Sequence, residues 1–134
     1  MKKSILEVYG LAVCFATVVC GVIALGIASY SLVQMINPSF TMNSYTYDRY
    51  QSNDAFWRYK SLPSYPPKKE EAQRPPEAEL TKERLEGYQT AVRAEYRSGA
   101  QGFVKSFIVI IIDALFFFFH WRIARRARET SIAA

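Results

Sequence analysis

The chain has 134 residues and a formal net charge of +5, which allows one domain at most and little water-soluble core. The positive charge is not interleaved with aromatic residues as on a folded nucleic-acid-binding patch, so we expect no nucleic-acid partner. Apolar residues are instead concentrated in two blocks: residues 11–28 contain no charge and residues 106–121 contain one. A stretch of about 18 residues without charge is typical of a membrane span. The sequence therefore predicts an all-α integral membrane protein whose two transmembrane helices form a helical hairpin.

The first span is predicted over residues 9–36, after a cytoplasmic N-terminus of residues 1–8. From Tyr9 to Tyr30 there are 22 residues, which is about 33 Å of helix and enough to cross the hydrocarbon core. Aromatic residues at both limits suit the membrane interface. We expect the helix to end before Asn37-Pro38, because proline removes a helix donor and disfavours helical geometry in its predecessor.

A cleavable signal peptide is the alternative interpretation of this first block. Lys2 and Lys3 resemble a charged n-region, and residues 26–28 loosely resemble a cleavage site. The apolar stretch is longer than the usual hydrophobic region of a signal peptide. We therefore expect an uncleaved anchor.

Small residues recur along the first span at alternating steps of four and three, a spacing that keeps them on one stripe of a helix. In lipid, small residues let two helices approach closely and gain packing energy. The stripe therefore predicts a helix-packing seam, although about half of the span's residues are small in any case. Its partner, either the second span or another subunit, is left open. The seam residues are Gly10, Cys14, Thr17, Gly21, Ala24, Ala28 and Ser31.

Cys14 and Cys20 both lie in the first span. Six residues apart, they point to different sides of one helix and cannot bridge to each other. No second group of His, Cys or carboxylate residues is nearby, so neither a metal nor another cofactor is expected.

The middle of the chain, residues 37–76, is predicted to be an aromatic and proline-rich extracytoplasmic segment. Its first part is crowded with tyrosine, phenylalanine and tryptophan, which suit surfaces with one apolar and one wet side. A small collapsed cap and a partner-binding surface are both compatible with that composition. Within the segment, residues 62–77 hold five prolines around a charged run, which predicts an extended spacer.

One further helix is predicted over residues 77–102, with a hinge at its end. Proline is tolerated in a first helical turn, so we expect a start near Pro76 or Glu77. Gly87 weakens the helical pattern, and residues 98–102, Ser-Gly-Ala-Gln-Gly, predict the hinge. No phosphate loop, nucleophile elbow or pair of catalytic carboxylates is present. We therefore do not expect an enzyme.

The second span is predicted over residues 103–121, followed by a basic cytoplasmic tail of residues 122–134. Arginines close to the end of a span favour the cytoplasmic side, and they also contact anionic lipid head groups at about 1 kcal/mol each. Lys2 and Lys3 favour the same side for the N-terminus. We therefore expect both termini in the cytoplasm of a bacterial inner membrane. The four arginines are Arg122, Arg125, Arg126 and Arg128.

Asp113 is the one charged residue between residues 106 and 121. A carboxyl at that depth costs about 2.5–3.5 kcal/mol on insertion scales, so it should face protein or water. Alignment of Tyr9 with Trp121 puts Asp113 level with Thr17, and we expect a hydrogen bond to Thr17 or to a neighbour at that level. His120 is seven residues from Asp113 and shares its helix face.

Two functions follow from these residues. In the first, the chain acts by association, as an accessory or structural subunit of a larger membrane complex or as a homo-oligomer, and Asp113 fixes helix register. In the second, Asp113 and His120 belong to a proton or cation path through an oligomer, since intramembrane acids and histidines recur in such relays. The expected partners are membrane lipids and either other membrane-protein subunits or further copies of this chain.

Overall fold

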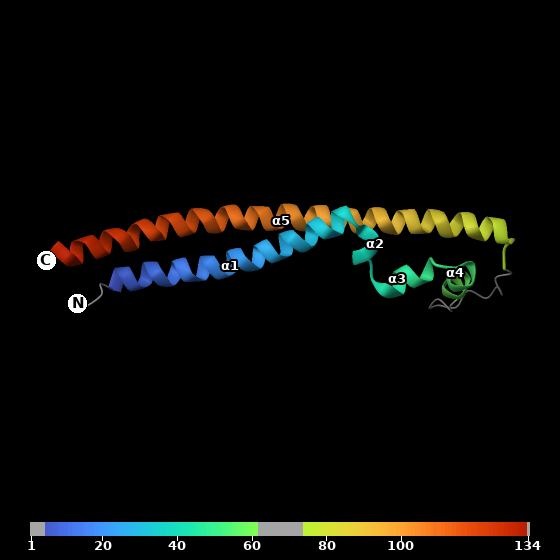
Figure 1. Cartoon of the computed structure of the whole chain (residues 1–134), viewed down its shortest axis with the longest axis horizontal. Coiled ribbons are helices and arrows are strands. Elements are labelled where there is room, and N and C mark those ends of the chain that lie inside the picture. Colours follow the sequence, from blue (N-terminus) through green and yellow to red (C-terminus); the bar gives the residue numbers. More distant parts are fainter. Residues whose placement is uncertain (1–4, 62–73, 134) are drawn as a thin grey trace. The chain divides into compact units, whose positions relative to one another are not determined.

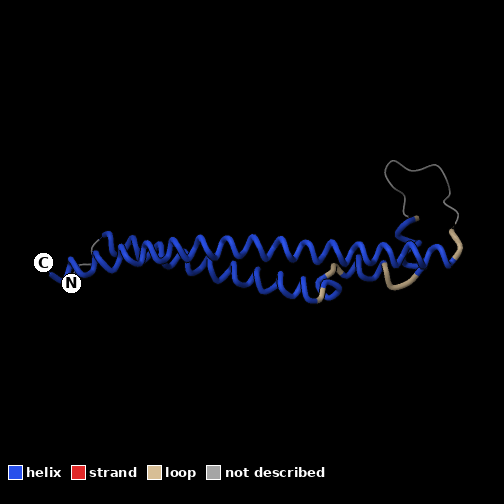
Figure 2. The backbone as a smooth tube through the Cα atoms, turned by 90° about the horizontal axis from the view of Figure 1, so that it is seen from above, coloured by secondary structure: helices blue, strands red, loops and turns tan. Residues whose placement is uncertain are grey.

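The structure, a computed structural model, describes residues 5–61 and 74–133. The described residues are mostly helical and contain no strand (Figures 1 and 2). The all-α fold class is therefore confirmed. The predicted spacer, residues 62–77, lies mostly outside the described part of the chain; residues 74–76 are non-helical and Glu77 is already helical.

Helix α1 comprises Ile5–Ile36. It ends directly before Asn37, whose backbone angles of φ −135° and ψ 74° lie outside the helical region that a following proline disfavours. The amide of Asn37 still donates to the Val33 carbonyl at 2.8 Å, which closes the last turn. At the other end the helix starts four residues before Tyr9, so Glu7 lies in its first turn, where a negative charge complements the helix dipole.

Helix α5 comprises Glu77–Ala133 and is continuous. Pro76 precedes it, and two glutamates in its first turn complement its dipole. The predicted hinge at residues 98–102 is wrong, because these residues are helical. A glycine in a helix costs only about 1 kcal/mol relative to alanine, and no proline interrupts the stretch. The predicted helix over 77–102 and the predicted second span are thus parts of one element.

Three short helices occupy the aromatic segment: α2 (Pro38–Thr41), α3 (Ser44–Arg49) and α4 (Asn53–Lys60). Side chains cap two of them, since Asn43 Oδ1 accepts from the Tyr45 amide at 2.9 Å and Ser52 Oγ accepts from the Ala55 amide at 3.1 Å. The expectation of one further helix in the external segment is therefore wrong. These helices are too short to leave a helical periodicity in the sequence, and only their caps mark them.

The chain divides into two compact units: Met1–Leu32 with Ala100–Ala134 as unit 1, and Val33–Gly99 as unit 2. Unit 1 contains most of α1 beside the C-terminal part of α5 (Figures 1 and 2). Gly10 of α1 lies against Ala124, and Ser31 lies against Gly102. The two helices of unit 1 therefore run antiparallel.

Unit 2 packs the short helices onto the first part of α5. The ring of Tyr50 lies against Gly87, where an added Cβ would come within 2.9 Å of the ring's Cε1. Arg84 of α5 connects to the end of α3 and the start of α4. Its Nη1 donates to the Tyr50 carbonyl at 2.6 Å, and its Nε donates to Asn53 Oδ1 at 2.9 Å. Leu80 is fully buried beneath these contacts. Residues at the end of α3 and the start of α4 are thus packed against α5, and the choice between a collapsed cap and a partner-binding surface stays open.

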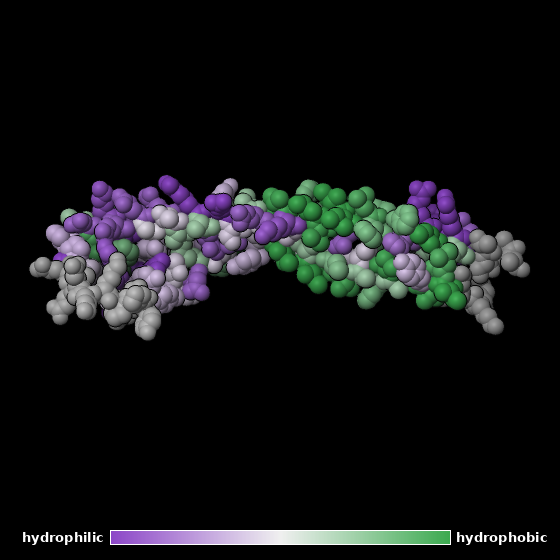
Figure 3. Space-filling model, turned by 180° about the vertical axis from the view of Figure 1, so that it is seen from behind, coloured by the Kyte–Doolittle hydropathy of each residue, from purple (hydrophilic) through white to green (hydrophobic). Residues whose placement is uncertain are grey.

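Two helices are long and apolar enough to cross a membrane. Their best 18-residue windows have mean hydropathies of 2.6 in α1 and 2.2 in α5, and only 22% and 6% of those windows are buried. The core helix of a soluble protein would be mostly buried. The apolar side chains instead form the broad hydrophobic surface of unit 1 (Figure 3). The two helices thus have the length, composition and exposure that are typical of membrane spans.

Candidate functional site

The predicted seam of α1 is the part of that helix that lies closest to α5 in unit 1. Five of its seven residues are buried, whereas Thr17 and Gly21 are partly exposed. The buried members are Gly10, Cys14, Ala24, Ala28 and Ser31. The stripe extends one step further than predicted, because Glu7, three residues before Gly10, is also buried.

A matching stripe runs along α5, with the same alternation of steps of four and three. Alternation of this kind on both helices gives coiled-coil-like packing. The stripe carries both polar residues singled out in the second span. Its members between residues 106 and 127 are Ser106, Ile110, Asp113, Phe117, His120, Ala124 and Ala127. Ile123, next to Ala124, is also partly shielded.

The two helices approach each other closely at Gly10. A Cβ at this position would lie 2.9 Å from the Ala124 Cβ and 3.2 Å from the His120 carbonyl oxygen. One turn further along α1, the Cys14 thiol donates to the Phe117 carbonyl at 3.7 Å. At the other end of the seam, a Cβ on Gly102 would lie 2.6 Å from Ser31 Oγ. Residues without a side chain therefore decide where the backbones meet.

Asp113 lies at the middle of this seam, about one turn deeper than predicted. It is midway along α5 between Gly102 and Ala124, whose partners are Ser31 and Gly10. Residues 20 and 21 are midway between those partners, so Asp113 is level with Gly21 rather than Thr17. The prediction aligned Tyr9 with Trp121 and so placed Asp113 about three residues from its observed level on α1. The contact at Gly10, and not these two aromatic residues, determines the register.

The hydrogen bond predicted between Asp113 and Thr17 is absent. The Thr17 hydroxyl donates to the Cys14 carbonyl of its own helix at 2.9 Å, an arrangement common for threonine in a helix. Asp113 Oδ2 is buried and has no hydrogen-bond partner among the described residues. Asp113 as a whole is partly exposed. Gly21, at the same level, has open space within 4 Å of its Cβ position.

His120 is buried in the seam, with 8% of its surface exposed. Its Nδ1 lies 2.9 Å from the Phe116 carbonyl oxygen; since a carbonyl only accepts, Nδ1 carries the proton. The ring also stacks on Phe116 and meets Tyr9 edge-on, with centroids 5.9 Å apart in both cases. Seven residues of helix, about 10.5 Å, separate His120 from Asp113, and Phe117 lies between them on the same face.

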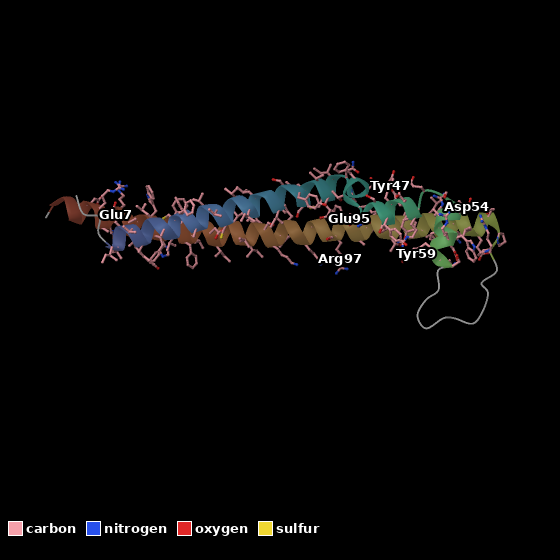
Figure 4. The ribbon with its side chains drawn as sticks, turned by 90° about the horizontal axis from the view of Figure 1, so that it is seen from below. Glu7, Tyr47, Asp54, Tyr59, Glu95 and Arg97 are labelled. Carbon is pink, nitrogen blue, oxygen red and sulfur yellow. The ribbon has the colours of Figure 1, made fainter. Side chains whose placement is uncertain are left out.

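The arginine-rich end of unit 1 contains an ion pair that the sequence interpretation missed. Arg128 Nε donates to Glu7 Oε1 at 3.0 Å, with the Glu7 side chain 7% exposed. Figure 4 shows Glu7 near the start of α1, beside the last turns of α5. Arg125 pairs within its own helix with Glu129, Nε to Oε1 at 3.2 Å. Arg128 therefore has a protein partner, and its contact with lipid stays a prediction. The sequence feature that could have identified Glu7 is its spacing: it lies three residues before Gly10, on the same stripe of α1 as the seam.

A second cluster surrounds Arg49 in unit 2. Its guanidinium carbon lies 4.6 Å from the centroid of the Tyr50 ring and 4.1 Å from that of Tyr59, and its Nη2 donates to the Tyr50 hydroxyl at 2.8 Å. Tyr59 and Tyr47 remain partly exposed on this unit (Figure 4). The cluster binds the short helices together by cation–π contact.

Neither cysteine takes part in a disulfide: Cys14 is buried and Cys20 exposed. In residues 5–61 and 74–133 no group of three or more His, Cys, Asp or Glu side chains is placed to hold a metal ion. Comparison with known proteins finds no matching family model, no matching curated protein and no matching solved structure. The geometry of the seam is therefore the basis for a functional proposal.

Proposed function

We propose that this chain is a two-pass membrane protein that acts by association, as an accessory or structural subunit of a larger membrane complex or as a homo-oligomer. In this proposal α1 and the C-terminal part of α5 form a helical hairpin in a bacterial inner membrane, and the aromatic segment is extracytoplasmic. The chain would have no catalytic activity of its own. The observation that carries the proposal is the unpartnered carboxyl group of Asp113.

The argument rests on the cost of that carboxyl. A buried polar atom without a hydrogen bond costs about 1–3 kcal/mol, in addition to the cost of placing Asp113 at mid-membrane depth. No described residue of the chain provides a donor. A donor from a neighbouring membrane protein would remove the penalty, provided that side chains at the level of Asp113 rearrange to admit it. Association would thus be favoured at the level of Asp113.

The proposed orientation rests on charge. Four arginines lie within seven residues at one end of the second span, and positively charged residues next to spans remain in the cytoplasm. The antiparallel pairing in unit 1 brings the start of α1 to that same end, because Glu7 contacts Arg128. Both termini would therefore be cytoplasmic.

An oligomeric proton or cation channel is the second candidate. The observation in its favour is that Asp113 and His120 lie on the same shielded stripe of α5, as a relay would require. Against it, Phe117 lies between them, and the Nδ1 proton of His120 is engaged by its own helix. A continuous path would need water or further polar groups, which a second copy would have to supply.

The test is a mild-detergent purification of the native protein with mass spectrometry and the mass of the intact particle. Asp113→Leu should weaken assembly roughly tenfold, since it removes the acceptor worth about 1.4 kcal/mol. The same substitution should raise the thermal stability of the isolated chain, because it removes a buried unpaired group. Leu115→Ala, at an exposed position of the same helix, is the control and should leave assembly intact. Unchanged assembly of Asp113→Leu would refute the proposal.

Liposome flux separates the two candidates. A channel that uses Asp113 and His120 should conduct between about pH 5 and 8, the range over which histidine changes charge, and should lose conduction in Asp113→Leu. Absence of proton and cation flux across this range in the wild type would exclude the channel. Recovery with unrelated membrane subunits at fixed ratio would favour the accessory subunit, and recovery alone as a defined particle would favour the homo-oligomer.

A further inference from the structure

A groove opens at the arginine-rich end of unit 1, beside the seam, with which it shares Ala124. It has a volume of about 300 Å³, at the lower end of the range for small-molecule sites. Leu11 of α1 lines one side of it, and residues of the last turns of α5 line the other. The lining residues are Leu11, Trp121, Ala124, Arg125, Arg128 and Glu129.

The groove has an apolar part and a charged rim. Leu11, Trp121 and Ala124 provide carbon surface, whereas Arg125 and Arg128 provide guanidinium groups and Glu129 provides the carboxylate that pairs with Arg125. Three residues apart on one helix, the two arginines are neighbours whose Cβ atoms are about 5–6 Å apart. Tryptophan at this position is typical of the level of lipid head groups. The groove therefore presents carbon surface toward the membrane and positive charge toward its boundary.

The ion pairs of the two arginines orient them without using up their donors. Arg128 binds Glu7 and Arg125 binds Glu129, in both cases through Nε. Among the described residues neither arginine makes a hydrogen bond through an Nη atom. Four N–H groups of each guanidinium are thus available, and a guanidinium held in place loses less entropy when it binds a further acceptor. Two such groups side by side match the oxygens of a phosphate.

We propose that this groove is a binding site for one anionic phospholipid, whose phosphate lies on Arg125 and Arg128 and whose first acyl carbons lie on Leu11 and Trp121. Glu129 and Glu7 balance the charges of Arg125 and Arg128. Arg122 is exposed at the same end of α5 and takes part in none of the ion pairs among the described residues, so its positive charge favours a head group with net negative charge over a zwitterionic one. The inference rests on the membrane insertion of unit 1 in the proposed function, but not on Asp113.

The test is native mass spectrometry of the purified full chain with phosphatidylglycerol or with phosphatidylcholine of the same acyl chains. We expect one phosphatidylglycerol retained per chain, in preference to phosphatidylcholine. Arg125→Gln should reduce retention roughly five- to tenfold. Arg122→Gln removes the same charge outside the groove and is the matched control. Arg128→Lys keeps a positive charge near Glu7 but loses the Nη fork, and it should also reduce retention.

Equal retention of the two lipids would overturn the site, and so would equal losses of lipid retention in Arg122→Gln and Arg125→Gln. Displacement of the lipid by millimolar inorganic phosphate would also overturn it, because it would show that the acyl contact contributes nothing. Carbonate extraction of membranes should be done first, to test insertion separately. A chain that stays in the membrane but retains no lipid refutes this site alone. Asp113→Leu should retain lipid as the wild type does, so failure of association and failure of the lipid site are distinguishable.

Discussion

Glu7 of α1 and Arg128 of α5 are joined by an ion pair of 3.0 Å in which the acid is buried and the base is exposed. The asymmetry matters energetically. An exposed pair contributes little, about 0–1 kcal/mol, whereas a buried carboxylate that loses its partner is strongly destabilising. The ion pair therefore acts chiefly by giving the buried Glu7 carboxylate a partner, at the end of unit 1 where α1 begins and the last turns of α5 lie.

Removal of the Arg128 guanidinium should destabilise unit 1. Arg128→Ala leaves Glu7 buried without a partner, and we expect a loss of about 1–2 kcal/mol, less than for a wholly buried pair because Arg128 is 60% exposed. Thermal unfolding in detergent, followed by circular dichroism, measures it. Arg125→Ala removes the exposed pair with Glu129 and should cost no more than about 0.5 kcal/mol. Equal losses in the two variants would contradict the structure.

Two glycines of α1 should respond oppositely to alanine. Gly10→Ala places a Cβ 3.2 Å from the His120 carbonyl, which is backbone and cannot rotate away, so we expect overpacking to cost about 1–3 kcal/mol. Gly26→Ala meets nothing within 4 Å and should stabilise α1 by roughly 0.5–1 kcal/mol through helix propensity. Unfolding in detergent compares them. A stabilising Gly10→Ala would disprove the close contact with α5.

The contact between Gly102 and Ser31 is suited to a double-mutant cycle. Gly102→Ala brings a Cβ within 2.6 Å of Ser31 Oγ, and because Ser31 is 3% exposed we expect a loss of about 1 kcal/mol. Ser31→Gly removes the clashing atoms, so the double variant should recover most of that loss. Additive effects of the two substitutions on unfolding would place the residues apart.

Arg84 should be needed to hold the short helices on α5. Lysine has one ammonium in place of the guanidinium fork, so Arg84→Lys should lose the bond to the Tyr50 carbonyl or that to Asn53, at about 1–2 kcal/mol. Hydrogen exchange at the amides of residues 50–53 should then accelerate. Arg93→Lys, on the exposed surface of the same helix, is the control, and similar exchange in both variants would refute the role of Arg84.

Unit 2 also contains a contact that depends on pH. The Asn53 amide donates to Glu77 at 2.8 Å, and this bond together with the Arg74 guanidinium lowers the pKa of the Glu77 carboxyl below its ordinary value of 4.5. Because the folded pKa is the lower one, the contact stabilises at pH above about 4.5 and is lost as pH falls through the lowered value.

An NMR titration of the side-chain amides from pH 7 to pH 2 tests this contact. The Asn53 signal should shift with a midpoint below 4.5, and Glu77→Gln should abolish the shift. Asn43, whose side chain caps α3 instead, serves as the reference. A midpoint at or above 4.5 would show that the bond does not form.

The sequence by itself determined the two long apolar stretches of helix. Two long apolar blocks specify helices that can cross a membrane, because every backbone group in lipid must be bonded within its own segment. Pro38 and Pro76 lie just outside the end of α1 and the start of α5, since proline lacks the donor that a helix interior needs. The steps of four and three along α1 also indicated which face of that helix carries small residues, because this periodicity is local.

Only the tertiary structure decided what those faces meet. The register of α1 on α5 follows from the absence of side chains at Gly10 and Gly102, and it placed Asp113 level with Gly21 instead of Thr17. Glycines in the second half of the chain suggested a weakened helix and a hinge, yet Gly87 and Gly102 lie inside α5 where Tyr50 and Ser31 press against it. The sequence alone does not distinguish a glycine at a hinge from a glycine that allows a neighbouring side chain to pack closely on a helix. Only the packing around the residue shows which of the two it is.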